Sequence, residues 1–119
     1  MRDFARREIA PHAAAWDEKE EMPWPAIRKM GEAGLLGIIA AKRLGGQEKD
    51  YIALGIAVEE VARVDNSCAM ILSMQNTLGT LIPGWGDDTV RAVIRGEKLL
   101  CIATSETEAG SDVSNMATH

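Results

Sequence analysis

The sequence has little of what several classes of protein require. Only two of its 119 residues are cysteines, Cys68 and Cys101, and no C-x-x-C spacing joins them. The two histidines, His12 and His119, lie far from both cysteines along the chain. The sequence therefore encodes no local zinc site and no redox pair. We expect both cysteines to be small, buried thiols.

Long apolar runs and clustered basic residues are also missing. No run reaches the roughly 20 apolar residues of a membrane-spanning helix, because Gln75, Asn76 and Thr77 interrupt residues 67–83. The first eight residues mix both charge signs and lack the apolar core of a signal peptide. The net charge is −5 and no Lys/Arg stripe is present, which argues against nucleic-acid binding. We expect one soluble domain from the cytosol or an organelle matrix.

What the chain does contain, up to residue 97, is helical periodicity. The first apolar stripe consists of Ala5, Ile9, Ala13 and Trp16. Pro11 lies inside that stripe, so the sequence predicts either a kink there or the start of a second helix. A short helix is expected after the Pro-Trp-Pro of residues 23–25, and Gly34 should end it.

Residues 34–46 interrupt this pattern, because their glycines favour an extended crossing followed by a turn. Two strong helices are expected next, at about 50–64 and 67–81, the first capped by Asp50 and the second by Asn66 or Ser67. The second helix is apolar nearly all round between positions 68 and 74, as expected of a helix buried among others. A last helix is predicted at 87–95.

The fold class predicted from these patterns is all-α, a helical bundle of about five to six helices over residues 1–97. After Lys98 the apolar run 99–104 is typical of a strand. A strand needs a partner, and residues 105–119 offer none with a suitable turn. We therefore predict that residues 98–119 are the truncated start of a following β-domain and that the chain is a fragment.

One segment, residues 105–112, has the composition of a ligand-binding loop. Small residues at 109–111 let the main chain approach a ligand, and the amides of Gly110 and Ser111 could point at a pyrophosphate or a carbonyl. The hydroxyls of Thr104, Ser105 and Ser111 could hydrogen-bond the same ligand. A polar turn capped by Asp112 would have the same composition, so the residues alone leave both interpretations open.

Residues 103–112, ATSETEAGSD, resemble the T-E-P-x-A-G-S-D signature of the acyl-CoA dehydrogenases. The other similar stretches are residues 2–13 (the first helix and its proline), 30–38, 44–46 (a Y-G-G turn) and 58–65 (E-E-L-A-R-x-D). The resemblance covers essentially the whole chain. It implies an all-helical N-terminal domain that precedes a middle β-domain.

The resemblance also implies flavin chemistry. Members of this family are oxidoreductases of fatty acid metabolism that use FAD to oxidise an acyl-CoA thioester to the 2,3-enoyl-CoA. A carboxylate base removes the α-proton while the β-hydrogen passes to the flavin as hydride. An electron-transfer flavoprotein or similar acceptor, a homotetramer, and a bacterial cytoplasmic or mitochondrial matrix location are implied as well.

Carried over position by position, the resemblance assigns site residues. The cofactor-binding residues would be Ile102, Thr104, Ser105, Gly110 and Ser111, with Ser105 at the pyrimidine edge of the flavin and Gly110 and Ser111 at the pyrophosphate. The acyl-CoA would meet Ser111, Met74 and Leu78. Thr107 replaces the proline of the motif, which should make the loop less rigid. No catalytic residue and no metal ligand is assigned, because the glutamate base lies outside these residues.

Two other hypotheses are compatible with the sequence. The chain could be a cofactor-free interaction module that docks a partner through the apolar helix at 67–81. It could also be a fold relative that acts on a non-CoA substrate, such as an acyl-carrier thioester or a nitroalkane. If the chain is instead part of an acyl-CoA dehydrogenase, the fragment alone is expected to be inactive and to hold FAD weakly, because it offers only one wall of each site.

Overall fold

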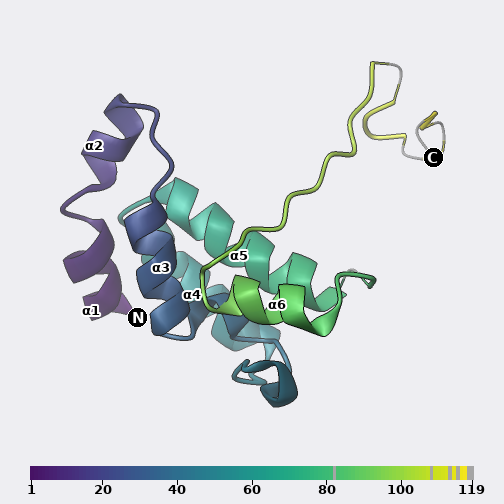
Figure 1. Ribbon diagram of the computed structural model, residues 1–119. Coiled ribbons are helices and arrows are strands. Elements are labelled where there is room, and N and C mark those ends of the chain that lie inside the picture. The colour runs from purple at the N-terminus through teal and green to yellow at the C-terminus, as the bar shows by residue number, and fades with distance from the viewer. Residues whose placement is uncertain (82, 108, 113, 115, 118–119) are drawn as a thin grey trace.

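The computed structural model describes residues 1–81, 83–107, 109–112, 114 and 116–117. Within those residues the chain forms six α-helices and no strand, which confirms the all-α prediction (Figure 1). The helices are α1 (Arg2–Phe4), α2 (Ala13–Glu18), α3 (Trp24–Glu32), α4 (Tyr51–Ala62), α5 (Asn66–Leu81) and α6 (Asp87–Ile94). A π-helical turn, η1 (Ala5–Ile9), and two 3-10 turns, η2 (Leu35–Gly37) and η3 (Lys42–Leu44), complete the elements.

Pro11 separates two helical segments, as its sequence position predicts. The chain runs from α1 directly into η1, turns at residues 10–12 and enters α2 at Ala13. Ala5 and Ile9 are buried and Trp16 is half-buried against the same core, so the predicted stripe faces inward. Because Pro11 cannot donate a helical hydrogen bond, a new helix begins after it.

The main core lies between α4 and α5, which contact each other more extensively than any other pair of elements. Val61 and Leu72 meet there, and Ile27 of α3 packs against the same cluster. One face of α5 lies outside this core, because the side chain of Met70 is 56% exposed. The chain's own helices leave this face of α5 uncovered, and burial of the helix inside a larger assembly of helices stays a prediction. No helix in the described part of the chain is long and apolar enough to span a bilayer.

Capping residues define where α4 and α5 begin. The Ala53 N–H donates to Asp50 Oδ1 at 2.8 Å, which confirms the predicted cap of α4. At α5, the Cys68 N–H donates to Asp65 Oδ1 at 2.5 Å. The predicted caps, Asn66 and Ser67, are therefore wrong, because these residues already belong to the helix and the carboxylate of the preceding residue reaches the free amide.

Two glycines allow α3 to pack directly on the end of α6. A Cβ atom on Gly31 would lie closer than 3.0 Å to the carbonyl group of Arg95, and one on Gly96 would lie 2.7 Å from the carbonyl oxygen of Ile27. Gly96 also has a φ of +73°, a left-handed conformation that glycine adopts without strain. The close approach of α3 to the end of α6 therefore requires glycine at both positions.

After α6 the chain runs alongside α5 and then leaves the bundle (Figure 1). Leu100 is buried, whereas residues 101–105 are exposed. The structure assigns no strand to residues 98–104, because no other described segment pairs with them. The strand expected at 99–104 is thus not formed here. That residues 98–119 begin a β-domain stays a prediction, and residues 108, 113, 115, 118 and 119 lie outside the described part.

The two cysteines differ in environment, which corrects the expectation that both are buried. Cys68 is buried at the start of α5. Its burial is the larger cause and the nearby Asp65 carboxylate the smaller one that together raise the pKa of the thiol to about 12. Cys101 is exposed, because it lies where the chain leaves the bundle. Sequence spacing could not reveal this difference.

We expect Ellman's reagent at pH 8 to titrate only Cys101 rapidly in the folded protein, because thiolate formation and access are both required for reaction. Cys68 should react only after denaturant is added. A Cys101→Ser variant provides the control and should show no fast phase. Rapid labelling of Cys68 in folded Cys101→Ser would contradict the buried placement of that thiol.

Candidate functional site

Helix α5 carries two adjacent polar side chains on its buried face. Gln75 is 4% exposed and Asn76 is 1% exposed, and each makes hydrogen bonds to main-chain groups of another segment. A buried amide without partners destabilises a protein, so such residues are expected to have a specific task. In the sequence these two residues only interrupt an apolar run, and that position is the signal that could have identified them.

Asn76 attaches the crossing segment to α5. Its Nδ2 donates to the Leu35 carbonyl at 2.9 Å and also to the Leu72 carbonyl at 2.9 Å. Its Oδ1 accepts from the Ile39 N–H at 3.3 Å. One side chain thereby satisfies one main-chain group in the first residue of η2 and another shortly after its end, where no helix supplies a partner.

Gln75 attaches the segment that follows α6. The Leu100 N–H donates to Gln75 Oε1 at 2.7 Å, and Gln75 Nε2 donates to the Leu100 carbonyl at 3.1 Å. The Leu100 side chain is buried with Leu78 of α5 and Val93 of α6. The main chain and the side chain of Leu100 are therefore both held, the first by an amide and the second by apolar contacts.

The residues expected to contact the acyl chain lie beside this attachment point. Leu78 is buried beneath Val93 and Leu100, and Met74 is half-buried against the same cluster. The indole Nε1 of Trp85 donates to the Leu78 carbonyl at 3.1 Å and so closes the cluster at one end. The structure thus brings Met74 and Leu78 close to the start of the predicted cofactor segment.

The residues expected to bind the cofactor are displayed to solvent. Ile102 is 50% exposed, and the other four are also exposed: Thr104, Ser105, Gly110 and Ser111. Among the described residues, no hydrogen bond involves the hydroxyl of Thr104, Ser105 or Ser111. In the described part of the chain, a Cβ atom on Gly110 would meet nothing within 4 Å, which leaves room for a ligand beside this main chain.

The acidic residues of this loop bear on whether an anion could bind. The Glu106 N–H donates to the Ala109 carbonyl at 2.7 Å, and Glu106 Oε2 accepts from the Ala117 N–H at 2.8 Å. The Glu106 carboxylate is thus engaged by its own loop, while Glu108 lies outside the described residues. Hydroxyls and main-chain N–H groups can donate hydrogen bonds to a diphosphate and to the polar edge of a ring. The donor chemistry therefore fits FAD.

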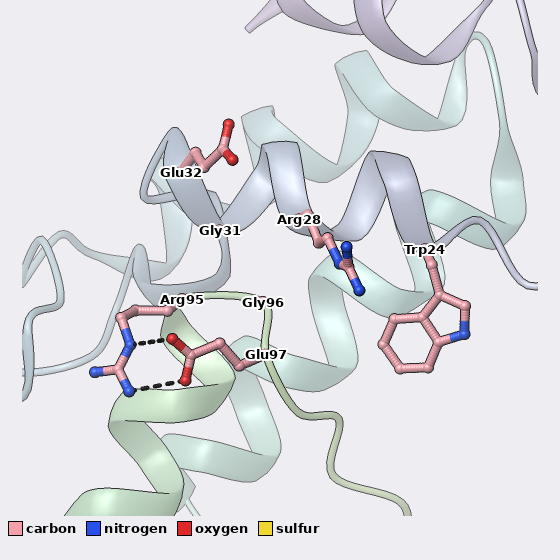
Figure 2. Close-up of a pocket in the computed structure, with 7 residues that line it drawn as sticks. All are labelled: Trp24, Arg28, Gly31, Glu32, Arg95, Gly96 and Glu97. Atoms are coloured by element: carbon pink, nitrogen blue, oxygen red, sulfur yellow. Dashed lines mark hydrogen bonds and ion pairs between the residues drawn. The ribbon is translucent and has the colours of Figure 1, made fainter.

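A cavity of about 850 Å³ lies elsewhere, between α3 and the end of α6 (Figure 2). Trp24 and Arg28 extend from α3 on the same side as Arg95 and Glu97, which form a bidentate pair at 2.7 and 2.9 Å. These hydrogen bonds lower the pKa of Glu97. The Trp24 side chain is 43% exposed. Mixed charges line this open space and specify no single ligand.

The hypothesis that residues 67–81 dock a partner protein requires the apolar face of α5 to be exposed. The large side chains of Leu72 and Leu78 are buried in the chain's own core, together with Cys68. Only Met70 and Leu81 are large exposed apolar residues of that helix. Most of the face that would have to receive a partner is therefore already covered.

The geometry can be compared with known proteins. The family model described as "Acyl-CoA dehydrogenase, N-terminal domain" matches residues 1–94. An acyl-CoA dehydrogenase of Bacillus subtilis is 33% identical over 99% of this chain and 33% of its own length. The mitochondrial short-chain specific acyl-CoA dehydrogenases of Mus musculus and Homo sapiens are 35% and 36% identical over 98% of this chain and 30% of theirs. The chain thus spans about a third of these relatives.

Proposed function

The chain belongs to the acyl-CoA dehydrogenase family, as its N-terminal helical domain, and we propose that it serves a longer, FAD-dependent enzyme that oxidises an acyl-CoA thioester. The family match over residues 1–94 carries this proposal, together with the motif at 103–112. FAD, when bound, supplies the hydride acceptor for formation of the 2,3-enoyl-CoA. No carboxylate of this chain is proposed as the base that removes the α-proton.

The proposed task of the loop is to hold and orient the flavin. Ser105 would hydrogen-bond the pyrimidine edge of the ring, with Ile102 and Thr104 against the ring system. Gly110 and Ser111 would present main-chain N–H groups to the diphosphate. The exposure of these residues and the open space at Gly110 support this assignment.

The proposed task of α5 is to shape the acyl pocket. Met74 and Leu78 would form part of its wall, and Ser111 would lie near the thioester end of the substrate. The apolar cluster that joins both α5 residues to Leu100 supports the proposal, because it keeps the helix close to the flavin-facing segment.

The longer protein would supply the remaining parts. Residues 98–119 would begin its middle β-domain, and an electron-transfer flavoprotein or similar acceptor would reoxidise the cofactor. A homotetramer in the bacterial cytoplasm or the mitochondrial matrix is proposed from the family alone. The proposed location is supported by relatives that include a bacterial protein and proteins named as mitochondrial.

The test compares the polypeptide encoded by the full reading frame with residues 1–119 alone. We expect the former to bind FAD and its absorbance to bleach when acyl-CoA is added anaerobically, whereas residues 1–119 should retain no flavin after gel filtration. Gly110→Val should weaken FAD binding at least about tenfold, because a branched side chain would stand between the main chain and the ligand.

The same variant tests the placement of the loop. Its melting temperature should match that of the wild type, since a Cβ at Gly110 meets no atom of the described residues within 4 Å. Gly55→Ala, at an equally open position in α4, is the matched control and should leave FAD affinity unchanged. A full-length product that is colourless and indifferent to added FAD would refute the proposed function.

A further inference from the structure

We propose that Gln75 is a positioning residue, whose amide fixes the main chain at Leu100 and thereby sets where the flavin-facing segment 102–111 begins. This inference rests on the proposed function, because that segment has a partner to be positioned against only if the enzyme binds FAD. It concerns a residue of α5 that the motif at 103–112 does not include.

The side-chain amide of Gln75 pairs with the main chain of Leu100 in the way that a residue of a neighbouring strand would. In an antiparallel sheet, a hydrogen-bonded residue both donates and accepts across to its partner. Here Leu100 donates through its N–H to Gln75 Oε1 and accepts through its carbonyl from Gln75 Nε2, at 2.7 and 3.1 Å. Gln75 is 4% exposed, so water does not compete for either bond. The amide thus pairs both main-chain groups of Leu100 without a neighbouring strand.

Packing determines which residue the amide holds. The Leu100 side chain lies in the cluster formed with Leu78 and Val93. A slip of one residue would move the chain by about 3.3 Å and turn alternate side chains to the opposite face. Cys101 or Leu99 would then face that cluster in place of Leu100. The amide and the apolar cluster together therefore select a single register.

Leu100 is also the last point of attachment before the proposed site. Residues 101–105 are exposed, and within the described chain no hydrogen bond joins them to a helix. Ile102, the first residue assigned to the flavin, follows Leu100 by two positions. A displacement at Leu100 would therefore be passed directly to the segment that meets the cofactor.

The position of Gln75 on α5 connects the two halves of the site. It follows Met74 and precedes Leu78 by three residues, and these two are the proposed acyl-pocket residues. The same rigid helix therefore carries part of the acyl wall and fixes the start of the flavin segment. A leucine at position 75 would fill comparable space without needing partners, so burial alone does not explain an amide there.

The experiment uses the polypeptide of the full reading frame and three variants. Gln75→Leu removes both hydrogen bonds, and Gln75→Glu retains only an acceptor at neutral pH. Gln47→Leu is the matched control, because Gln47 Nε2 also donates to a main-chain carbonyl, that of Gly34, at 2.8 Å, but away from the exit segment. The readouts are hydrogen–deuterium exchange of peptides spanning 98–104, FAD dissociation constants and the flavin absorbance spectrum.

For Gln75→Leu we expect faster exchange across 98–104, FAD binding weakened at least about tenfold and an altered flavin spectrum. Gln47→Leu should change none of these. At neutral pH the three readouts for Gln75→Glu should resemble those for Gln75→Leu. As the pH falls, they should approach those of the wild type measured at the same pH. A protonated carboxyl group both donates and accepts, and burial beside a carbonyl favours that form.

The outcomes separate this inference from the proposed function. If the wild type binds FAD and Gln75→Leu binds it within about twofold with an unchanged spectrum, the positioning role is wrong and the proposed function stands. Unchanged exchange at 98–104 would likewise overturn it. A wild type without FAD affinity would overturn both. If Gln75→Leu fails to fold, the pH-dependent recovery of Gln75→Glu decides, and its absence counts against the inference.

Discussion

Gly31→Ala is expected to destabilise the protein by about 3 kcal/mol, the upper part of the usual range for overpacking. A Cβ atom at this position would lie closer than 3.0 Å to the carbonyl group of Arg95 and to the nitrogen of Gly96. These are main-chain atoms at the end of α6, so no flexible side chain can move aside. Relief requires α3 and α6 to separate, which would open the contact between them.

The matched control is Gly55→Ala in α4. Gly55 is also helical, but a Cβ there would meet nothing within 4 Å. Alanine should therefore stabilise the helix by about 0.5–1 kcal/mol, because it loses less conformational entropy on folding than glycine does. Urea unfolding followed by circular dichroism measures both variants. Equal effects of the two substitutions would contradict the close approach of α3 and α6.

Asn76→Leu is expected to destabilise the protein by about 3 kcal/mol, because it removes the partners of two groups that the crossing segment cannot satisfy itself. These are the Leu35 carbonyl, bonded at 2.9 Å, and the Ile39 N–H, bonded at 3.3 Å. Leaving a buried main-chain group unpaired costs about 1–3 kcal/mol. Leucine branches at Cγ as asparagine does and is larger, so the substitution leaves no cavity that could account for the loss.

Thr77→Ala is the neighbouring control for that substitution. The Thr77 hydroxyl donates only to the carbonyls of Ser73 and Met74 in its own helix. Its removal should change stability by less than about 1 kcal/mol, because alanine restores helix propensity. Thermal and urea unfolding should agree on this order. A loss for Thr77→Ala as large as that for Asn76→Leu would mean that the tertiary bonds of Asn76 contribute little.

Local signals predicted the helices well. Pro11 broke the first helical stripe, Asp50 capped α4 and Gly34, with a φ of +72°, ended α3. Each of these effects acts within one turn of the chain, so the residues concerned are neighbours in sequence. The cap of α5 was misplaced by one or two residues, because Asp, Asn and Ser can all cap a helix and one of each stands in the row 65–67.

Signals that depend on distant segments were less informative. The apolar run at 99–104 was interpreted as a strand, but a strand exists only when another segment pairs with it. Cys101 was expected to be buried, yet it lies where the chain leaves the helices. In both cases the residue type was compatible with burial, and the position of the rest of the chain determined the outcome.

By itself, the sequence determined the all-α class, the approximate helix boundaries and the family motif at 103–112, because each is encoded by residues close together in the chain. Only the tertiary structure decided that Gln75 holds Leu100 and that Asn76 holds the crossing segment, 25 to 41 residues away. An amide in an apolar run needs partners, but the main-chain groups that meet that need are selected by how the helices pack.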